Sequence, residues 1–244
     1  MLRELGVTEP NEIDLEAIAW TQGVHVRYRP LKGCEARVLG ANDRAVVAIN
    51  SSSRPQRRRF SLAHELGHWH HHRGKTLFCR VDDIGGNRGA TQVERVANGF
   101  AADLLMPGYL FDPRADPKLP SFATVDWLAD EFTVSRTAAA IRYVQRSNRP
   151  LVLAKYEQGG RGPFVCSPAV PSKWWTKKEV HPDTRAFAIL YGRQGSEKAM
   201  SKAKASTWFE GWEAERHDVT CQVVASYGGG ILALIHLPDS MLRD

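Results

Sequence analysis

The feature that most constrains this chain is the motif His-Glu-Leu-Gly-His at residues 64–68, inside a run whose pattern is helical. Residues four apart share one face of an α-helix, so His64 and His68 project side by side, as two ligands of one metal ion must. Glu65 stands beside the first histidine, where a carboxylate can act as a general base toward a metal-activated water. The motif predicts a helix with a catalytic metal site. The alternative is an amphipathic helix with two exposed histidines.

A catalytic zinc site needs a third protein ligand, with water in the fourth position. The next apolar-periodic segment, residues 91–107, predicts a second helix, and Glu94 adjoins its apolar stripe. Two histidines from one helix and a glutamate from the next form the gluzincin arrangement. The alternative is that Thr91 and Glu94 form only a capping box. We favour Glu94 as the third ligand, with zinc as the expected ion and manganese as the alternative.

The two motifs together resemble the ImmA/IrrE family of bacterial metallopeptidases. They read Arg-Phe-Ser-Leu-Ala-His-Glu-Leu-Gly-His at 59–68 and Glu-x-x-Ala-Asn-x-Phe-Ala-x-x-Leu-Leu-Met-Pro at 94–107. The resemblance covers about the first half of the chain. It implies a zinc-dependent endopeptidase that cleaves helix-turn-helix transcriptional repressors, of mobile elements or of a stress response, and so derepresses their genes.

The same resemblance implies His64, His68 and Glu94 as metal ligands and Glu65 as the general base. Many family members carry a second glutamate just before the Ala-Asn pair, where this chain has Val96. Glu94 is therefore the only candidate in the motif. Asp103 holds a place that is often glutamate in the family, and we interpret it as a residue that does not bind the metal.

Composition sets broad limits on the protein. A chain of 244 residues can form two or three units, and its net charge of +6 favours nucleic acid or acidic partners. No apolar run is long enough for a membrane span, and the first residues do not form a signal peptide, so we expect a cytoplasmic protein. The cysteines lie too far apart in sequence to form a Cys-x-x-Cys motif. We therefore expect reduced and mostly buried thiols at Cys34, Cys79, Cys166 and Cys221.

Residues 1–112 predict a minimal zincin-like domain, in a chain of the α+β class. The expected elements are a helix capped by Asn11, a small three-stranded sheet and the metal helix from Arg54 to His72; the strands are 24–28, 35–39 and 45–50. The last two strands should form a hairpin around the turn at 40–43. A substrate peptide is expected to add to the sheet edge along residues 45–50.

The group that stabilises the oxyanion is not assigned by the sequence. Tyr109 and the cluster His70 to His72 are the candidates. For the histidines, the alternative is exposure at a helix C-terminus, where positive charge is favoured.

Residues 111–120 hold three prolines and predict a linker without helix, and Gly74 to Gly89 predict a loop. Residues 120–148 then predict two helices joined by a short turn, as in a helix-turn-helix. Their functional interpretation is DNA contact through Ser135, Arg136 and Arg142. The alternative, which we favour, is a helical pair that packs beside the peptidase or receives the substrate.

Residues 150–244 predict a C-terminal α+β domain that resembles the GAF-like sensor domain of some family members. Four strands are expected within it, at 151–156, 164–170, 219–226 and 231–237. The segment 186–191 is ambiguous, and 196–215 is expected to be partly helical. Its aromatic residues are expected in the core: Trp208, Phe209 and Trp212.

The sequence therefore supports a metallo-endopeptidase whose partner is a protein, with weak DNA binding and no membrane association. The competing hypothesis is a DNA-binding transcriptional regulator whose metal site is structural or vestigial. That hypothesis depends on the basic charge and on the predicted helical pair. An open metal site with Glu65 nearby would favour the enzyme.

Overall fold

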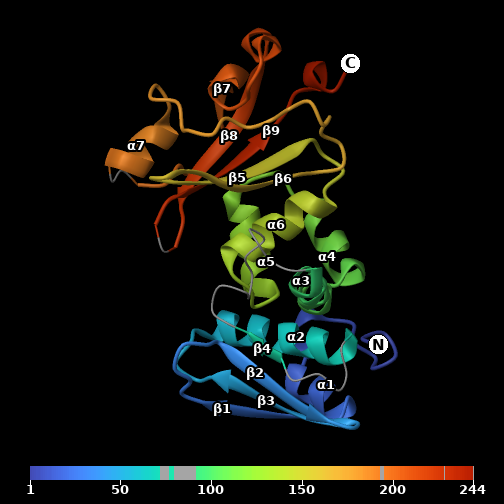
Figure 1. The fold of residues 1–244 in the computed structure, drawn as a ribbon. Coiled ribbons are helices and arrows are strands. Elements are labelled where there is room, and N and C mark those ends of the chain that lie inside the picture. The colour runs from blue at the N-terminus through green and yellow to red at the C-terminus, as the bar shows by residue number, and fades with distance from the viewer. Residues whose placement is uncertain (72–76, 80–91, 193–194, 228, 244) are drawn as a thin grey trace. The chain divides into compact units, whose positions relative to one another are not determined.

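The computed structural model describes residues 1–71, 77–79, 92–192, 195–227 and 229–243 (Figure 1). It has mixed α+β architecture and two compact units. The first unit comprises residues 1–111 and 129–135, and the second comprises residues 112–128 and 136–244. No helix in the described ranges is both long and apolar enough to cross a membrane.

The first unit holds a four-stranded sheet with strand order β1-β3-β2-β4. Its elements in chain order are η1 (Pro10–Glu12), α1 (Leu15–Thr21), β1 (Val24–Arg29), β2 (Ala36–Ala41), β3 (Arg44–Asn50), α2 (Pro55–His71), β4 (Leu77–Cys79), α3 (Gln92–Leu105) and the start of α4 (Gly108–Ala115). The three predicted strands are confirmed. The fourth, β4, lies where the sequence predicted only a loop, and it pairs with β2 through three residues.

The hairpin of β2 and β3 is confirmed. Ala41 pairs with Arg44 across a two-residue turn, and Asn42 adopts a left-handed φ of 55°. Asparagine tolerates this conformation better than most residues because its short polar side chain can bond locally. The turn therefore fixes a register that sends alternate residues of both strands toward the helices.

The prediction that a peptide adds along residues 45–50 is wrong, because β3 is a central strand. β1 pairs with β3 in parallel, with Val26 opposite Val47, and β2 pairs with it on the other side. Both rows of β3 backbone groups are thus already used within the sheet. The chain passes from β1 to β2 across the position of β3, which then lies between them, so β1 and β4 are at the edges.

The first helix begins later than predicted. Asp14, not Asn11, caps α1 by accepting a hydrogen bond from the Ala17 amide at 3.0 Å. The preceding residues form η1, whose Glu12 carboxylate accepts bonds from the amides of Thr8 and Glu9. These local bonds compete with an α-helical start at Asn11.

Helix α2 packs on the sheet through Trp69, which is 3% exposed and donates its indole N–H to the Gln22 carbonyl. The Trp69 ring lies against Gly40 of β2. A Cβ at Gly40 would fall 2.3 Å from a carbon of that ring, closer than any real contact. Glycine at this position therefore lets the helix approach the sheet.

We expect Gly40→Ala to lower the free energy of unfolding by about 1–3 kcal/mol, because overpacking forces a buried ring to move. Urea denaturation followed by circular dichroism measures the change. Gly99→Ala is the matched control, since a Cβ at Gly99 meets no atom within 4 Å and lies in a helix. The control should be as stable as the parent protein or more stable. An unchanged midpoint for Gly40→Ala would contradict the close packing.

The segment predicted as a linker contains the end of a helix. Helix α4 runs from Gly108 to Ala115 and includes Pro113. The side chain of Phe111 anchors it, because it is fully buried and its ring lies 5.3 Å from the ring of Phe132. Of the three prolines, Pro117 and Pro120 follow the end of the helix. The free energy gained by burying apolar side chains exceeds the cost of the one backbone hydrogen bond that Pro113 cannot donate.

The second unit is built on a five-stranded antiparallel sheet with strand order β6-β5-β9-β8-β7. Its elements are α5 (Phe122–Glu131, whose last residues belong to the first unit), α6 (Arg136–Arg146), β5 (Leu151–Glu157), β6 (Gly160–Cys166), α7 (Arg185–Gly192), β7 (Ser201–Lys204), η2 (Ala205–Thr207), η3 (Trp212–Arg216), β8 (Asp218–Ala225), β9 (Ile231–His236) and η4 (Asp239–Met241).

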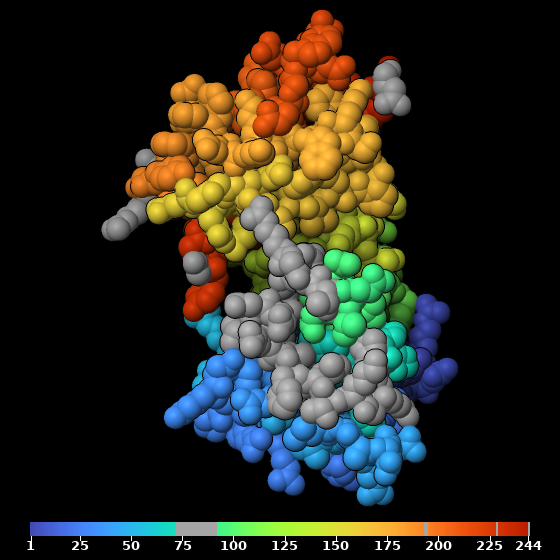
Figure 2. Space-filling model, in the orientation of Figure 1, coloured from blue at the N-terminus to red at the C-terminus, as the bar shows by residue number. Residues whose placement is uncertain are grey.

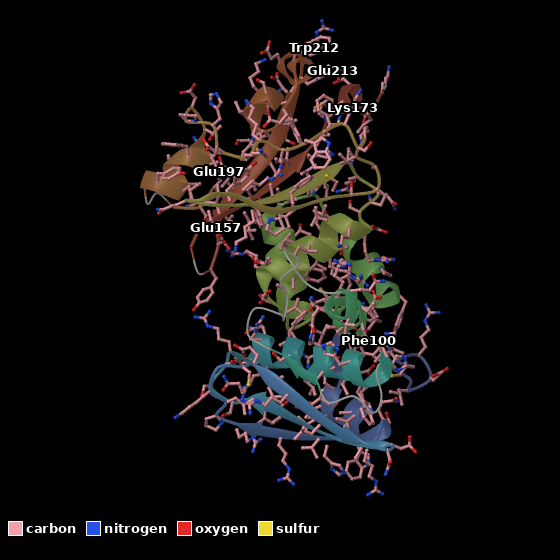
Figure 3. The ribbon with its side chains drawn as sticks, in the orientation of Figure 1. Phe100, Glu157, Lys173, Glu197, Trp212 and Glu213 are labelled. Atoms are coloured by element: carbon pink, nitrogen blue, oxygen red, sulfur yellow. The ribbon has the colours of Figure 1, made fainter. Side chains whose placement is uncertain are left out.

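The structure corrects several predictions for the second unit. The ambiguous segment is the helix α7, and residues 196–215 hold β7 and two 3-10 helices in place of an α-helix. Trp208 and Phe209 are core residues as predicted, whereas Trp212 is 64% exposed (Figure 3).

The start of α5 is tied to the second sheet by the buried side chain of Gln222. Its carbonyl oxygen accepts a bond from the Phe122 amide at 2.8 Å, and its amide group donates to the Glu197 carbonyl. The Glu197 carboxylate in turn accepts from the Val223 amide at 2.7 Å. Helix α6 packs against β5 and β6. The helical pair is thus partly built into the second unit.

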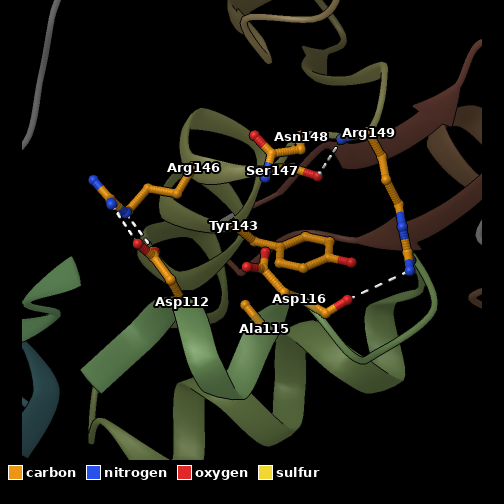
Figure 4. A pocket seen from close by; sticks show the side chains of 8 residues that line it. All are labelled: Asp112, Ala115, Asp116, Tyr143, Arg146, Ser147, Asn148 and Arg149. Atoms are coloured by element: carbon orange, nitrogen blue, oxygen red, sulfur yellow. Dashed lines mark hydrogen bonds and ion pairs between the residues drawn. The ribbon is translucent and has the colours of Figure 1, made fainter. Parts of the chain in front are cut away.

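A depression of about 200 Å³ lies in this unit between the end of α4 and the end of α6 (Figure 4). Arg146 forms a two-pronged ion pair with Asp112 at one side of it. Arg149 donates to the Lys118 carbonyl at 2.6 Å at the other side. Both guanidinium groups beside the depression thus form bonds within the protein.

Candidate metal site

Helix α2 carries three of the predicted site residues, and all three are buried. His64 and Glu65 are 0% exposed and His68 is 1% exposed. Pro55 begins the helix at the position where a missing N–H costs nothing. The helix matches its predicted span to within a residue at its start, while His72 lies outside the described residues.

Glu94, in the first turn of α3, meets the two histidines. Its carboxylate oxygens lie 3.1 Å from His64 Nε2 and 3.4 Å from His68 Nε2. The two Nε2 atoms are 2.9 Å apart. His64, His68 and Glu94 are the group of potential metal-binding side chains found within the described residues.

This donor set fits a divalent ion. Two imidazole nitrogens and a carboxylate oxygen are the preferred protein ligands of catalytic zinc, and tetrahedral ligands at ~2.0 Å from the ion lie about 3.3 Å apart. The observed separations of 2.9, 3.1 and 3.4 Å bracket that spacing. Of the three side chains, only that of Glu94 is partly exposed, at 15%. The cluster could therefore hold one divalent ion.

Close contact between α2 and α3 depends on Gly67, the fourth residue of the motif. A Cβ at Gly67 would lie 3.1 Å from the Ala97 Cα and 3.2 Å from the Phe100 Cβ. Glycine and alanine at the crossing allow the helix backbones to approach closely. This approach places Glu94 within reach of both histidines.

Asn98 supports the site from the next turn of α3, and sequence reasoning gave it no role. Its side-chain oxygen lies 3.0 Å from His64 Nδ1. An amide oxygen can only accept, so Nδ1 carries the proton and Nε2 presents its lone pair toward Glu94 and His68. The available signal was the spacing Glu94-x-x-x-Asn98, which puts both side chains on one face of a helix.

We expect Asn98→Ala to weaken zinc binding by about 10–100-fold, because groups that orient a ligating histidine contribute that much to metal affinity. Competition with a chromogenic chelator measures the affinity. Asn98→Asp, which keeps an accepting oxygen at the same place, should restore most of it. Equal zinc affinity in the parent protein and Asn98→Ala would show that His64 does not need this bond.

Other candidates from the sequence make contacts with residues outside the cluster. The Tyr109 hydroxyl donates to the Val7 carbonyl at 2.8 Å, and His70 and His71 are exposed and pack on Phe100. Val96 and Asp103 are exposed on α3. Thr91, the other half of the proposed capping box, lies outside the described residues.

None of the thiols that the structure describes belongs to this cluster. Cys34, Cys166 and Cys221 are free, and the side chain of Cys79 lies outside the described set. Burial raises the pKa of Cys166, and it raises the pKa of Cys221 to about 11. Both thiols therefore stay protonated and poorly nucleophilic at neutral pH.

The residues proposed for DNA contact are not all presented to solvent. Arg136 forms a two-pronged ion pair with Asp126 at 2.5 and 2.9 Å, and Arg142 is only 8% exposed. Ser135 is exposed. Of the three, only Arg142 is buried, whereas Arg136 and its partner Asp126 lie at the surface.

Comparison with known families identifies the first half of the chain. The model of the family described as the IrrE N-terminal-like domain matches residues 19–143. This range includes His64, His68 and Glu94. This chain belongs to the ImmA/IrrE family. The family assignment agrees with the geometry of the cluster.

Two relatives of this ImmA/IrrE member carry the name radiation response metalloprotease IrrE. The protein of Deinococcus deserti is 33% identical over 123 residues, which are 48% of this chain and 44% of the relative. The protein of Deinococcus radiodurans is 29% identical over 159 residues, which are 64% of this chain and 44% of the relative. The matched region thus spans less than half the length of each relative.

A solved structure titled Mycobacterium tuberculosis transcriptional regulator resembles the ImmA/IrrE chain with a TM-score of 0.61 at 15% identity. The alignment covers 97% of this chain and 84% of that one. At this identity the likeness concerns the fold alone.

Proposed function

We propose that this protein is a zinc-dependent endopeptidase. The observation that carries the proposal is the convergence of His64, His68 and Glu94 within 4.8 Å of one another, with Glu65 on the same helix. A bound divalent ion, zinc or alternatively manganese, supplies Lewis acidity that polarises a peptide carbonyl and lowers the pKa of water. The metalloprotease name of both relatives supports the same activity.

Each residue of the site then has a role. His64, His68 and Glu94 hold the ion, and Asn98 keeps His64 in the tautomer that can bind it. Glu65 accepts the proton of the attacking water and passes it to the leaving amine. Burial of Glu65 keeps its carboxylate away from bulk water, where its charge would be screened.

The proposed substrate is a helix-turn-helix transcriptional repressor, and its cleavage would derepress genes of a stress response or a mobile element. Family membership supports this substrate class. The proposed domains are a zincin-like peptidase at 1–112, a helix-turn-helix-like pair at 120–148 and a GAF-like sensor at 150–244. The five-stranded antiparallel sheet of β5 to β9 supports the last assignment.

The test is cleavage of the repressor encoded beside this protein. Purified full-length chain is incubated with that repressor, with and without a chelator, and the products are identified by mass spectrometry. We expect one defined cut that the chelator abolishes and added zinc restores. Cleavage that persists after the metal is removed would exclude the proposed mechanism.

The competing function is a DNA-binding regulator with a structural or vestigial metal site. The burial of Arg142 argues against the helical pair as its DNA-reading element, because one of the two arginines proposed for DNA contact does not reach the surface. We therefore propose only weak, sequence-independent DNA binding through basic surface residues.

A further inference from the structure

The outer face of the first sheet carries both basic and apolar side chains. Helices α1 and α2 pack on the other face: Tyr28 bonds Glu16 of α1, and Trp69 of α2 lies against Gly40. Alternate residues of β1 to β3 therefore point away from these helices. Figure 3 shows nitrogen-tipped side chains projecting from the strands on this side, and β1 to β3 form part of the blue surface in Figure 2.

The register places apolar residues at the centre of this face. Val46 of β3 stands between His25 of β1 and Leu39 of β2 in one row. Leu39 is 53% exposed and Val46 is 38% exposed. Together with neighbouring residues they line a shallow depression of about 380 Å³. It is large enough to take an apolar side chain.

Arginines surround that centre. Arg27 and Arg37 flank Ala48 in the next row, Arg29 continues along β1, and Arg44 lines the depression. The three strands contain four arginines and no carboxylate. Arg37 donates to the Cys34 sulfur at 3.0 Å. The other three make no ion pair within the part of the chain that the structure describes.

We propose that this face, defined by Arg27, Arg29, Leu39, Arg44 and Val46, docks an acidic protein segment with an apolar anchor side chain. An apolar centre within a polar rim is the usual anatomy of a protein interface, and arginine is enriched there. Charge complementarity requires carboxylates on the partner, since a second copy of this face would repel it. A nucleic acid would satisfy the arginines and leave the exposed Leu39 and Val46 without a matching surface. The surface is independent of the metal cluster.

The test measures binding of a fluorescein-labelled synthetic peptide in which aspartates and glutamates surround a central Phe-Leu pair. Fluorescence polarisation is read with the full-length chain at low and physiological ionic strength. We expect Arg27→Glu combined with Arg44→Glu to weaken binding by at least about tenfold, because opposed charges across an interface become like charges. Leu39→Ser should weaken binding as well, with little change in its salt dependence.

Lys198→Glu combined with Lys202→Glu is the matched control, because it makes the same change in net charge at exposed residues of the second unit. The control should bind like the parent protein. A peptide with serines in place of Phe-Leu should bind more weakly than the original. Equal binding by the parent, the double arginine variant and Leu39→Ser, with unchanged melting curves, would overturn the proposal. Tighter binding of a random DNA duplex that the double arginine variant loses would also overturn it and assign the face to nucleic acid.

Discussion

Glu65→Gln is expected to abolish peptide hydrolysis while the protein keeps its fold and its metal ion. Glutamine has the size of glutamate but cannot accept the proton of the attacking water. General-base catalysis contributes about two to four orders of magnitude in rate, and the variant should lose at least that much. Glu65 is fully buried and does not belong to the three-ligand cluster, so its change to a neutral amide should leave the ligands in place. Repressor cleavage and zinc content are measured on the same preparation.

Asp103→Asn is the matched control for this experiment. It removes an exposed carboxylate from α3, the helix that carries Glu94, and should leave the cleavage rate unchanged. Wild-type cleavage by Glu65→Gln would exclude Glu65 as the base. Loss of zinc together with activity would instead assign Glu65 a structural role.

The local elements around the site could be predicted because their signals are local. The periodicity of α2 and the turn residues between β2 and β3 depend on residues a few positions apart. Strand order could not be predicted in the same way. The parallel pairing of β1 with β3 joins segments separated by β2, and no residue pattern in β3 marks it as central. The expected substrate edge was wrong for this reason.

The histidine pair of the proposed metal site could be predicted from the sequence because its spacing matches helix geometry. The role of Asn98 was not, because its bond to His64 depends on how closely α2 and α3 approach. That distance is set by Gly67 against Ala97 and Phe100, a tertiary contact. The helix α4 was missed for a related reason: buried Phe111 offsets the unfavourable proline that follows it.

The second unit shows the same limit. The arginines of α6 looked suitable for DNA contact because a helical pattern alone does not show which side chains become buried. The structure buries Arg142 and pairs Arg136 with Asp126, ten residues earlier. The charge pattern of a helix is therefore a weak guide to DNA binding until the burial of each arginine is known.

His68→Ala is expected to remove the bound metal ion. The proposed site has three protein ligands, and loss of one imidazole leaves only His64 and Glu94, too few to hold zinc tightly. Because a ligand that binds only the folded state stabilises it, zinc at a hundred times its dissociation constant should stabilise the parent protein by about 2.7 kcal/mol. His68→Ala should lose this stabilisation.

His70→Ala is the matched control, since His70 is exposed on the same helix and packs on Phe100, away from the cluster. It should keep both its zinc and the shift in melting temperature that zinc produces. Elemental analysis and melting curves with and without zinc decide the result, and equal metal content in the parent protein and His68→Ala would exclude this cluster as the metal site.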